Sequence, residues 1–206
     1  MRTLLVATTN PGKLREIRHV MSGVPVQLVG LGDLPPLEEP EETGATFEHN
    51  ARLKAHYYSD RSGLWTVAED SGLVIDALGG DPGVKSARFL HPDATYPQRF
   101  AEIYRRLSEH PDLRRTARFV AALASVDRGQ VVYETRGIVE GEITDAPRGS
   151  GGFGYDPIFL YLPYGRTLAE VSDADKVAVA HRGIAFRNFA RWIREQSSTD
   201  VFSEER

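Results

Sequence analysis

The sequence contains no cysteine, so the chain can form neither disulfide bonds nor thiolate metal sites. A cysteine-free chain fits a reducing compartment, and we expect the protein to be cytoplasmic. The six histidines are scattered and lack the spacing of a zinc site. A G-x-S-x-G nucleophile elbow is missing too, so a serine or cysteine hydrolase triad has no support.

Long hydrophobic runs and an excess of positive charge are also lacking. No apolar run approaches the roughly 20 residues of a spanning helix, and the start, "MRTLLVATTNPGK", has no small-residue cleavage site, so we expect no signal peptide. Lys and Arg total 25 against 29 acidic residues, a net charge of -4. Polymeric nucleic acid favours a basic stripe, so we do not expect it as a partner. Without a long apolar run we do not expect a membrane as a partner either. The net charge is compatible with a small anionic ligand.

The composition is that of an ordinary globular protein. The 206 residues, 41% of them hydrophobic and 26% charged, suffice for a single domain over 1–206 with its own core. Early in the chain, strands predicted over 3–7 and 26–30 flank a helix that Asn10 caps and Gly23 ends. A hairpin over 117–126 and 130–141 follows later. This order predicts a mixed α/β sheet.

The remaining pattern predicts further elements between and after these. We expect a helix from Thr46 to about Asp60, a strand over 66–80 broken by "EDSG", a helix over 97–109, a short strand at "PIFLY", a helical stretch over 173–196 with a possible break at Gly183, and a frayed tail over 197–206.

The segment "TTNPGK" (8–13) joins a buried strand to a helix start. Unpaired N–H groups and the positive end of the helix dipole gather at such a turn, which favours an anion. It does not match a Walker A loop, which needs two glycines five residues apart and a Lys-Ser/Thr pair. An ordinary capped helix is the alternative explanation.

Two pairs of acidic residues are candidates for metal binding. Glu41 and Glu42 lie in an acidic loop over 32–44, and Glu69 and Asp70 follow an apolar strand. Mg²⁺ takes one or two carboxylates together with phosphates and waters. Solvated loop acids are the alternative, especially for Glu41 and Glu42.

Four cationic or donor side chains and one glycine-rich loop complete the candidates. Lys54, Lys176, His181 and Arg182 each read alone as surface cations, but phosphates, a metal and a base edge would together need such groups. The loop "GGFGYDPIF" (151–159) has more glycines than a turn requires, beside aromatic rings that can stack on a base. A hairpin turn with core aromatics is the alternative.

Taken together, these segments resemble the inosine triphosphate pyrophosphatase family. The resemblance rests on "LLVATTNPGKLREI", "EETGATFEHNARLKA", "AEDSGLVIDALGGDPGVKSARF", "GGFGYDPIF" and "AHRG", in that order, and covers nearly the whole chain. It implies Mg²⁺-dependent hydrolysis of noncanonical purine nucleoside triphosphates (ITP, dITP, XTP) to the monophosphate and pyrophosphate. It also implies an elongated mixed-sheet α/β fold of two lobes with a central cleft, and a homodimer.

The resemblance further implies roles for individual residues. Asp70 would be the catalytic proton acceptor and would bind Mg²⁺ with Glu41 or Glu42. The substrate would contact the turn and donor residues Thr8, Thr9, Asn10, Pro11, Gly12, Lys13, Lys54 and Ser71, and on the base and sugar side Phe153, Gly154, Tyr155, Asp156, Lys176, His181 and Arg182.

The sequence departs from the family's pattern at two positions. Ala180 stands where Ser is common before His-Arg, and Glu69 stands where Asp is frequent. The first loses a hydroxyl that would orient His181, and the second moves a carboxylate by one methylene. A nucleotide-binding regulator without turnover and a phosphohydrolase releasing orthophosphate, or acting on pyrimidine or methylated nucleotides, are the rival hypotheses.

Overall fold

The computed structural model describes the backbone of residues 1–203 and the side chains of residues 1–198. Within this part of the chain the helices and longer strands are β1 (Arg2–Val6), α1 (Pro11–Val20), β2 (Val26–Gly30), α2 (Phe47–Ser62), β3 (Trp65–Ile75), α3 (Tyr96–Ser108), β4 (Thr116–Asp127), β5 (Gln130–Ile143), β6 (Phe159–Tyr161), β7 (Arg166–Thr167), α4 (Asp173–Val179) and α5 (His181–Ser203).

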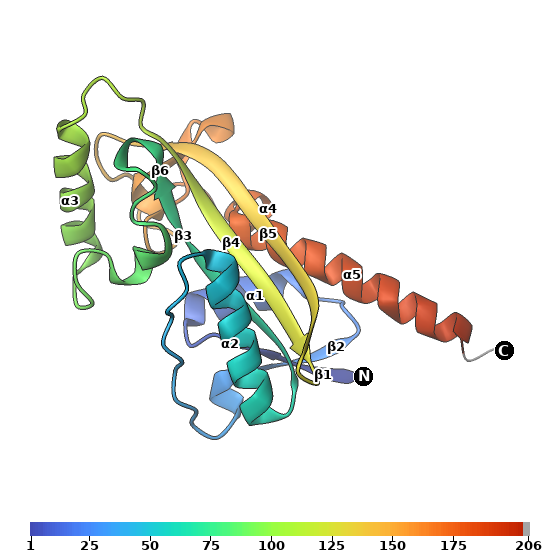
Figure 1. Cartoon of the computed structure of the whole chain (residues 1–206). Coiled ribbons are helices and arrows are strands. Elements are labelled where there is room, and N and C mark those ends of the chain that lie inside the picture. Colours follow the sequence, from blue (N-terminus) through green and yellow to red (C-terminus); the bar gives the residue numbers. More distant parts are fainter. Residues whose placement is uncertain (204–206) are drawn as a thin grey trace. The chain divides into compact units, whose positions relative to one another are not determined.

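The strands form one mixed sheet in the order β2-β1-β3-β4-β5-β6-β7, in which the long strands β3, β4 and β5 run side by side (Figure 1). Strand β1 is parallel to both neighbours, with Leu4 opposite Leu28 of β2 and Trp65 of β3. Strands β5, β6 and β7 pair antiparallel. The predicted mixed α/β class is therefore confirmed.

The chain divides into two compact units. Unit 1 comprises Met1–Asp70, Ala121–Gly137 and Arg182–Arg206, and unit 2 comprises Ser71–Val120 and Ile138–His181. Strands β3, β4 and β5 contribute residues to both units.

Unit 1 has a core between its strands and two helices. Leu4 and Val6 of β1 are buried with Ile17 of α1 and Phe186 and Phe189 of α5. Alternate residues of a strand point to opposite faces, so α1 and α5 cover the same face of the sheet.

Unit 2 has a separate core built on aromatic rings. Phe119 of β4 and Phe159 of β6 lie with ring centroids 4.6 Å apart. Helix α3 adds Phe100, Ile103 and Leu107, which recur at helical spacing and are all buried.

Three predicted boundaries differ from those in the structure. Strand β3 runs through "EDSG" without a break, because Glu69 and Asp70 are buried beside cationic partners rather than placed in a polar turn. The helical break falls at Ala180, which has extended backbone (ψ 151°), and Gly183 lies inside α5. Helix α5 continues to Ser203 through the segment where a tail was expected, and 204–206 lie outside the described residues.

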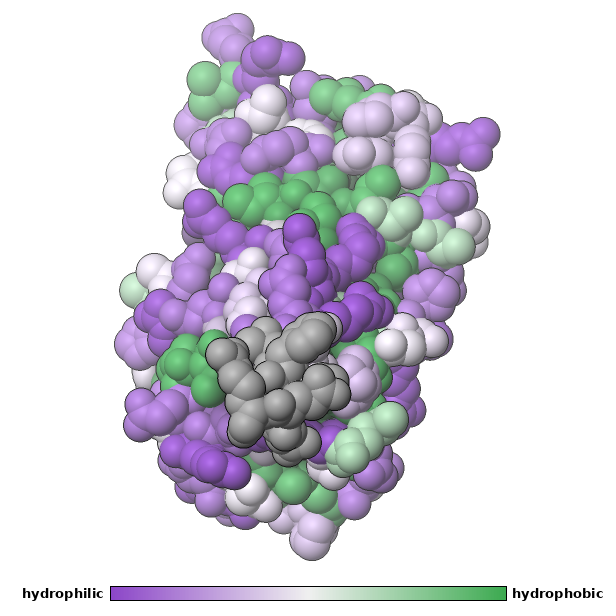
Figure 2. All heavy atoms as spheres, turned by 90° about the vertical axis from the view of Figure 1, so that its right-hand side faces the viewer, coloured by the Kyte–Doolittle hydropathy of each residue, from purple (hydrophilic) through white to green (hydrophobic). Residues whose placement is uncertain are grey.

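The face drawn in Figure 2 is hydrophilic over most of its area, with smaller hydrophobic parts between. Among the residues that the structure describes, no helix is long and apolar enough to cross a membrane.

Candidate functional site

The turn after β1 is organised by Asn10, the N-cap of α1. Its side-chain oxygen accepts hydrogen bonds from the backbone N–H groups of Gly12 and Lys13 at 2.9 and 3.1 Å. The hydroxyl of Thr8 accepts the N–H of Asn10 at 3.2 Å, while Thr9 and Pro11 are exposed. The sequence predicted unpaired N–H groups here, but Asn10 accepts those of Gly12 and Lys13, so the turn is a capped helix start that carries the positive end of α1.

Lys54 joins two carboxylates at the centre of unit 1. Its Nζ lies 2.7 Å from Oε1 of Glu42 and 3.0 Å from Oδ1 of Asp70. The sequence left Glu41 and Glu42 open as partners of Asp70. The structure brings Glu42 to this cluster and leaves Glu41 exposed.

Asn50 ties this cluster to the acidic loop. Its amide donates to Oδ2 of Asp70 at 3.1 Å, and its oxygen accepts the N–H of Gly44 at 2.8 Å. Sequence reasoning gave Asn50 no role. The signal was its position four residues before Lys54, which puts both side chains on one face of α2.

The electrostatics of this cluster favour proton transfer at Asp70. Burial raises the pKa of the Asp70 carboxyl, and Lys54 and Asn50 oppose that shift without cancelling it. Burial lowers the pKa of Lys54, but the carboxylates of Asp70 and Glu42 outweigh it, so the net shift is upward. The pair thus combines a persistent cation with a carboxylate that accepts a proton more readily than an ordinary Asp.

The donor set suits a hard divalent cation. Glu42 and Asp70 already converge on one positive charge, the Lys54 ammonium, and two carboxylates are what Mg²⁺ requires beside phosphates and waters. No group of three or more His, Asp or Glu side chains that could hold a metal ion occurs in the described part of the chain. The fit therefore depends on ligands that a substrate and water supply.

Lys13 is paired with Glu69, whose Oε1 lies 2.9 Å from its Nζ. Burial lowers the pKa of Lys13, and Glu69 opposes that shift. The same Glu69 oxygen accepts Nε of Arg182 at 2.9 Å, and Nη1 of Arg182 donates to Glu16 at 2.6 Å. Arg182, predicted on the base side, thus lies in unit 1 between two carboxylates.

In unit 2, Asp156 organises the glycine-rich loop. Its Oδ2 accepts the backbone N–H of Phe153 at 2.8 Å and lies 2.7 Å from Nζ of Lys176. Both carboxylate and ammonium are buried. A Cβ at Gly152 would lie 2.2 Å from this oxygen, and Gly152 has φ +67°, so only glycine fits there.

Lys176 also lies over an aromatic ring. Its Nζ is 4.2 Å from the centroid of the Phe153 ring, within the range of a cation–π interaction. The sequence predicted Phe153, Asp156 and Lys176 as one group, and the structure brings them together. Gly154, with φ +69°, follows the ring in the same loop.

His181 and Tyr155 are packed into the same unit. The His181 ring stacks on Phe119 at 4.9 Å with 13° between the planes. The hydroxyl of Tyr155 donates to the carbonyl of Ser86 at 2.8 Å, so Tyr155 is an anchor of the loop. Ser71, the residue after Asp70, is half-buried in β3.

The first strand of this α/β sheet leads into a helix with a capped N-terminus, and lysines and paired carboxylates lie in the same unit. This combination is typical of α/β proteins that bind phosphorylated ligands. Comparison with known proteins narrows this class. The Ham1 family model matches residues 4–192. The chain belongs to the Ham1 family, which confirms the resemblance found in the sequence.

Individual relatives cover almost the whole chain. A protein of Geobacter sulfurreducens named dITP/XTP pyrophosphatase is 45% identical over 185 residues, 90% of this chain and 93% of that protein. The structure of a HAM1 protein from Coxiella burnetii superposes with a TM-score of 0.87 at 34% identity, covering 95% of this chain and all of that one (100%). The structure of a dITP/XTP pyrophosphatase from Mycobacterium abscessus is 45% identical, with a TM-score of 0.69, and covers 86% of this chain and 93% of that one.

Proposed function

We propose that this protein hydrolyses noncanonical purine nucleoside triphosphates (ITP, dITP and XTP) to the nucleoside monophosphate and pyrophosphate. The observation that carries the proposal is the convergence of Glu42 and Asp70 on Lys54 in a chain 45% identical to a dITP/XTP pyrophosphatase. A homodimer and a cytoplasmic location are part of the same proposal.

The phosphates bind to unit 1 in this proposal. The turn over 8–13 offers the positive end of α1, and the ammonium groups of Lys13 and Lys54 supply full charges. Preorganised cations of this kind stabilise the negative charge that develops on leaving pyrophosphate.

Mg²⁺ would be held by Glu42 and Asp70, together with oxygens of the substrate and water. Bound there, Mg²⁺ would withdraw charge from the phosphate oxygens. Lys54 fixes the carboxylates of Glu42 and Asp70, and the Asn50 amide donates a hydrogen bond to the second oxygen of Asp70.

Asp70 is the proton acceptor in this mechanism. A water oxygen forms a bond to the α-phosphorus, the bond from that phosphorus to the bridging oxygen of the β-phosphate breaks, and pyrophosphate leaves. The proton of the attacking water passes to the Asp70 carboxylate.

The base binds to the glycine-rich loop over 151–159 in this proposal. Phe153 offers a ring for stacking, which holds any purine with about 1–3 kcal/mol. Selection falls to donors, because ITP, dITP and XTP share a 6-oxo group where ATP has a 6-amino group, and they lack the 2-amino group of guanine. Lys176, His181 and the loop's N–H groups are the donors that unit 2 provides.

The product of the reaction tests this function. We expect pyrophosphate, and no orthophosphate, from ITP, dITP and XTP with Mg²⁺, and far slower turnover of ATP and of pyrimidine or methylated nucleotides. Release of orthophosphate, or a preference for another base, would assign a different phosphohydrolase. Binding of ITP without turnover would make the protein a nucleotide sensor.

Substitution His181→Ala tests the choice of base. Sites that pair a polar group reject the mismatched analogue by factors of up to about 10⁴. Removing one donor should lower the ratio of kcat/KM for ITP over ATP by about tenfold or more. Substitution of His56, on α2 in unit 1, by Ala is the control. An unchanged ratio in His181→Ala would place the selection on other donors.

A further inference from the structure

Four charged side chains of unit 1 form a series of three ion pairs whose two ends are joined by helix α1. Lys13 Nζ lies 2.9 Å from Glu69 Oε1, Arg182 Nε lies 2.9 Å from the same oxygen, and Arg182 Nη1 lies 2.6 Å from Glu16 Oε2. Glu16 follows Lys13 by three residues on α1, so both project from the same side of the helix. The series of ion pairs therefore begins on α1 at Lys13 and ends on α1 at Glu16.

This network, which we name the charge ring, is shielded from water. The side chains of Glu69 and Arg182 are 2% and 3% exposed, Glu16 is 12% exposed, and Lys13 is 20% exposed. Two cations and two anions make the ring neutral. Removing one member leaves a buried charge without compensation, and the remaining members must rearrange.

The ring has one shared atom, Oε1 of Glu69, which accepts from both cations. A guanidinium tends to pair with a carboxylate through two parallel N–H groups. Here Arg182 donates from Nη1 to Glu16 and from Nε to Oε1 of Glu69, so the one guanidinium joins both carboxylates. That arrangement keeps Glu69 placed to hold the Lys13 ammonium as well.

We propose that Glu16 and Arg182 are positioning residues that act through Glu69 to hold the Lys13 ammonium where a phosphate chain is bound. This inference rests on the proposed function insofar as the phosphate belongs to a nucleoside triphosphate. Glu69 then acts as the partner that holds Lys13.

Substitution Glu16→Gln tests the inference, because it removes one charge with little change in shape. Without that anion the buried Arg182 guanidinium loses one charged partner and shifts, Glu69 shifts with it, and Lys13 loses its fixed position. Misplacement of a binding group by about 1 Å can cost about 10²-fold in rate. We expect kcat/KM for ITP to fall about tenfold or more in Glu16→Gln. The matched control is Glu102→Gln, which removes one of the two carboxylate partners of the exposed Arg105 on α3 in unit 2.

A double-mutant cycle with Lys13→Met separates positioning from general stability. If Glu16 acts through Lys13, adding Glu16→Gln to Lys13→Met should change kcat/KM by no more than about twofold, because the group it positions is already gone. Equal effects of Glu16→Gln in both backgrounds would overturn the inference. Thermal unfolding of all four proteins identifies any variant that loses activity through misfolding.

Binding of inorganic triphosphate, measured by calorimetry on the same four proteins, makes the result independent of turnover. If the wild type does not hydrolyse ITP but triphosphate binding shows the same coupling between Glu16 and Lys13, the proposed function fails and the charge ring stands. If the wild type hydrolyses ITP and both cycles are additive, the function stands and the positioning role fails. A wild-type protein that does not bind triphosphate contradicts both.

Discussion

The Asp70→Asn variant should hydrolyse ITP about a thousandfold more slowly than the wild type, because general base catalysis contributes about 10²–10⁴ in rate. Asparagine keeps the shape and can still accept the hydrogen bond from Asn50, but it cannot take the proton of the attacking water. The measurement is kcat for pyrophosphate release with saturating Mg²⁺. Turnover close to that of the wild type would remove Asp70 from the mechanism.

The same variant should not lose stability. Because the folded-state pKa of Asp70 is raised, the folded protein binds this proton more tightly than the unfolded chain does. The stability linked to the proton is full below the unfolded pKa and is lost as pH rises through the folded pKa. At neutral pH the ionised carboxylate is therefore destabilising relative to a neutral amide, and Asp70→Asn should unfold at the same temperature as the wild type or higher.

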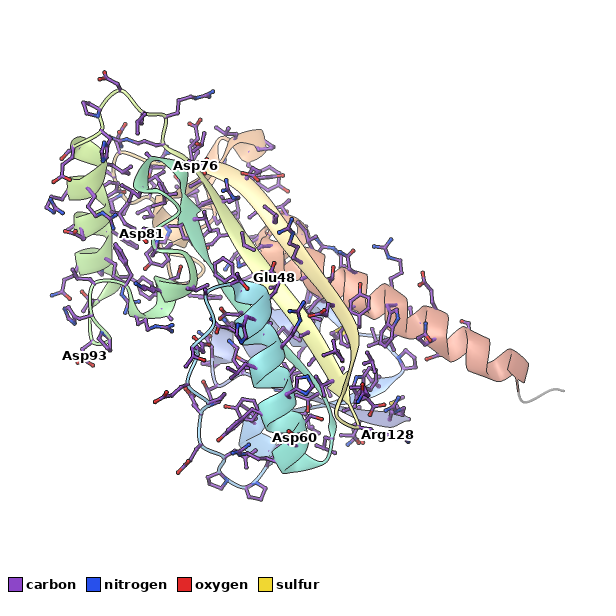
Figure 3. The ribbon with its side chains drawn as sticks, viewed as in Figure 1. Glu48, Asp60, Asp76, Asp81, Asp93 and Arg128 are labelled. Atoms are coloured by element: carbon purple, nitrogen blue, oxygen red, sulfur yellow. The ribbon has the colours of Figure 1, made fainter. Side chains whose placement is uncertain are left out.

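The control for Asp70→Asn is Asp60→Asn. Asp60 lies in the last turn of α2 and is exposed (Figure 3). Its substitution makes the same chemical change outside the cluster of Lys54, Glu42 and Asp70. We expect unchanged kcat and an unfolding temperature near that of the wild type. A marked loss of unfolding temperature in Asp70→Asn alone would contradict the linkage argument.

The Lys54→Met variant should lose about 10²–10³ in kcat, the cost of removing one preorganised charge donor. It should also change the pH dependence. Lys54 lowers the pKa of Asp70 against the effect of burial, so without Lys54 that pKa rises further. Since the base acts deprotonated, the acid limb of the kcat/KM profile should move to higher pH.

Lys85→Met is the matched control for this change, because Lys85 is exposed in unit 2. We expect its pH profile to superpose on that of the wild type. A Lys54→Met profile that loses height without moving along the pH axis would mean that Lys54 acts on the phosphates and leaves the proton affinity of Asp70 unchanged.

Local patterns predicted much of the fold. The segment "VQLVG" became β2 with the expected bounds, and Asn10 and Thr46 cap the helices they were expected to cap. These features depend on neighbours in the chain, which a sequence displays directly. The course of β3 through "EDSG" was missed, because two acidic residues inside a strand look like a turn until their cations are known.

The candidate site was also predictable only where local motifs carried the information. Lys13, Asp70 and Phe153 could be chosen from motifs, but no motif shows that Glu16 and Arg182 meet, since 166 residues separate them. The choice between Glu41 and Glu42 likewise depends on the path of an acidic loop, which the hydrogen bond from Gly44 to Asn50 fixes. Long-range pairing of charges was the information that the sequence lacked.

The loop over 151–159 has a practical consequence for altering base preference. Gly152 admits no side chain, and Asp156 holds both the loop backbone and Lys176, so a change at any of these three positions disturbs the other two. Phe153 differs, because its backbone N–H carries the hydrogen bond to Asp156 while its ring is only half-buried. A library that varies position 153 and keeps its neighbours can therefore search for new base preferences without dismantling the loop.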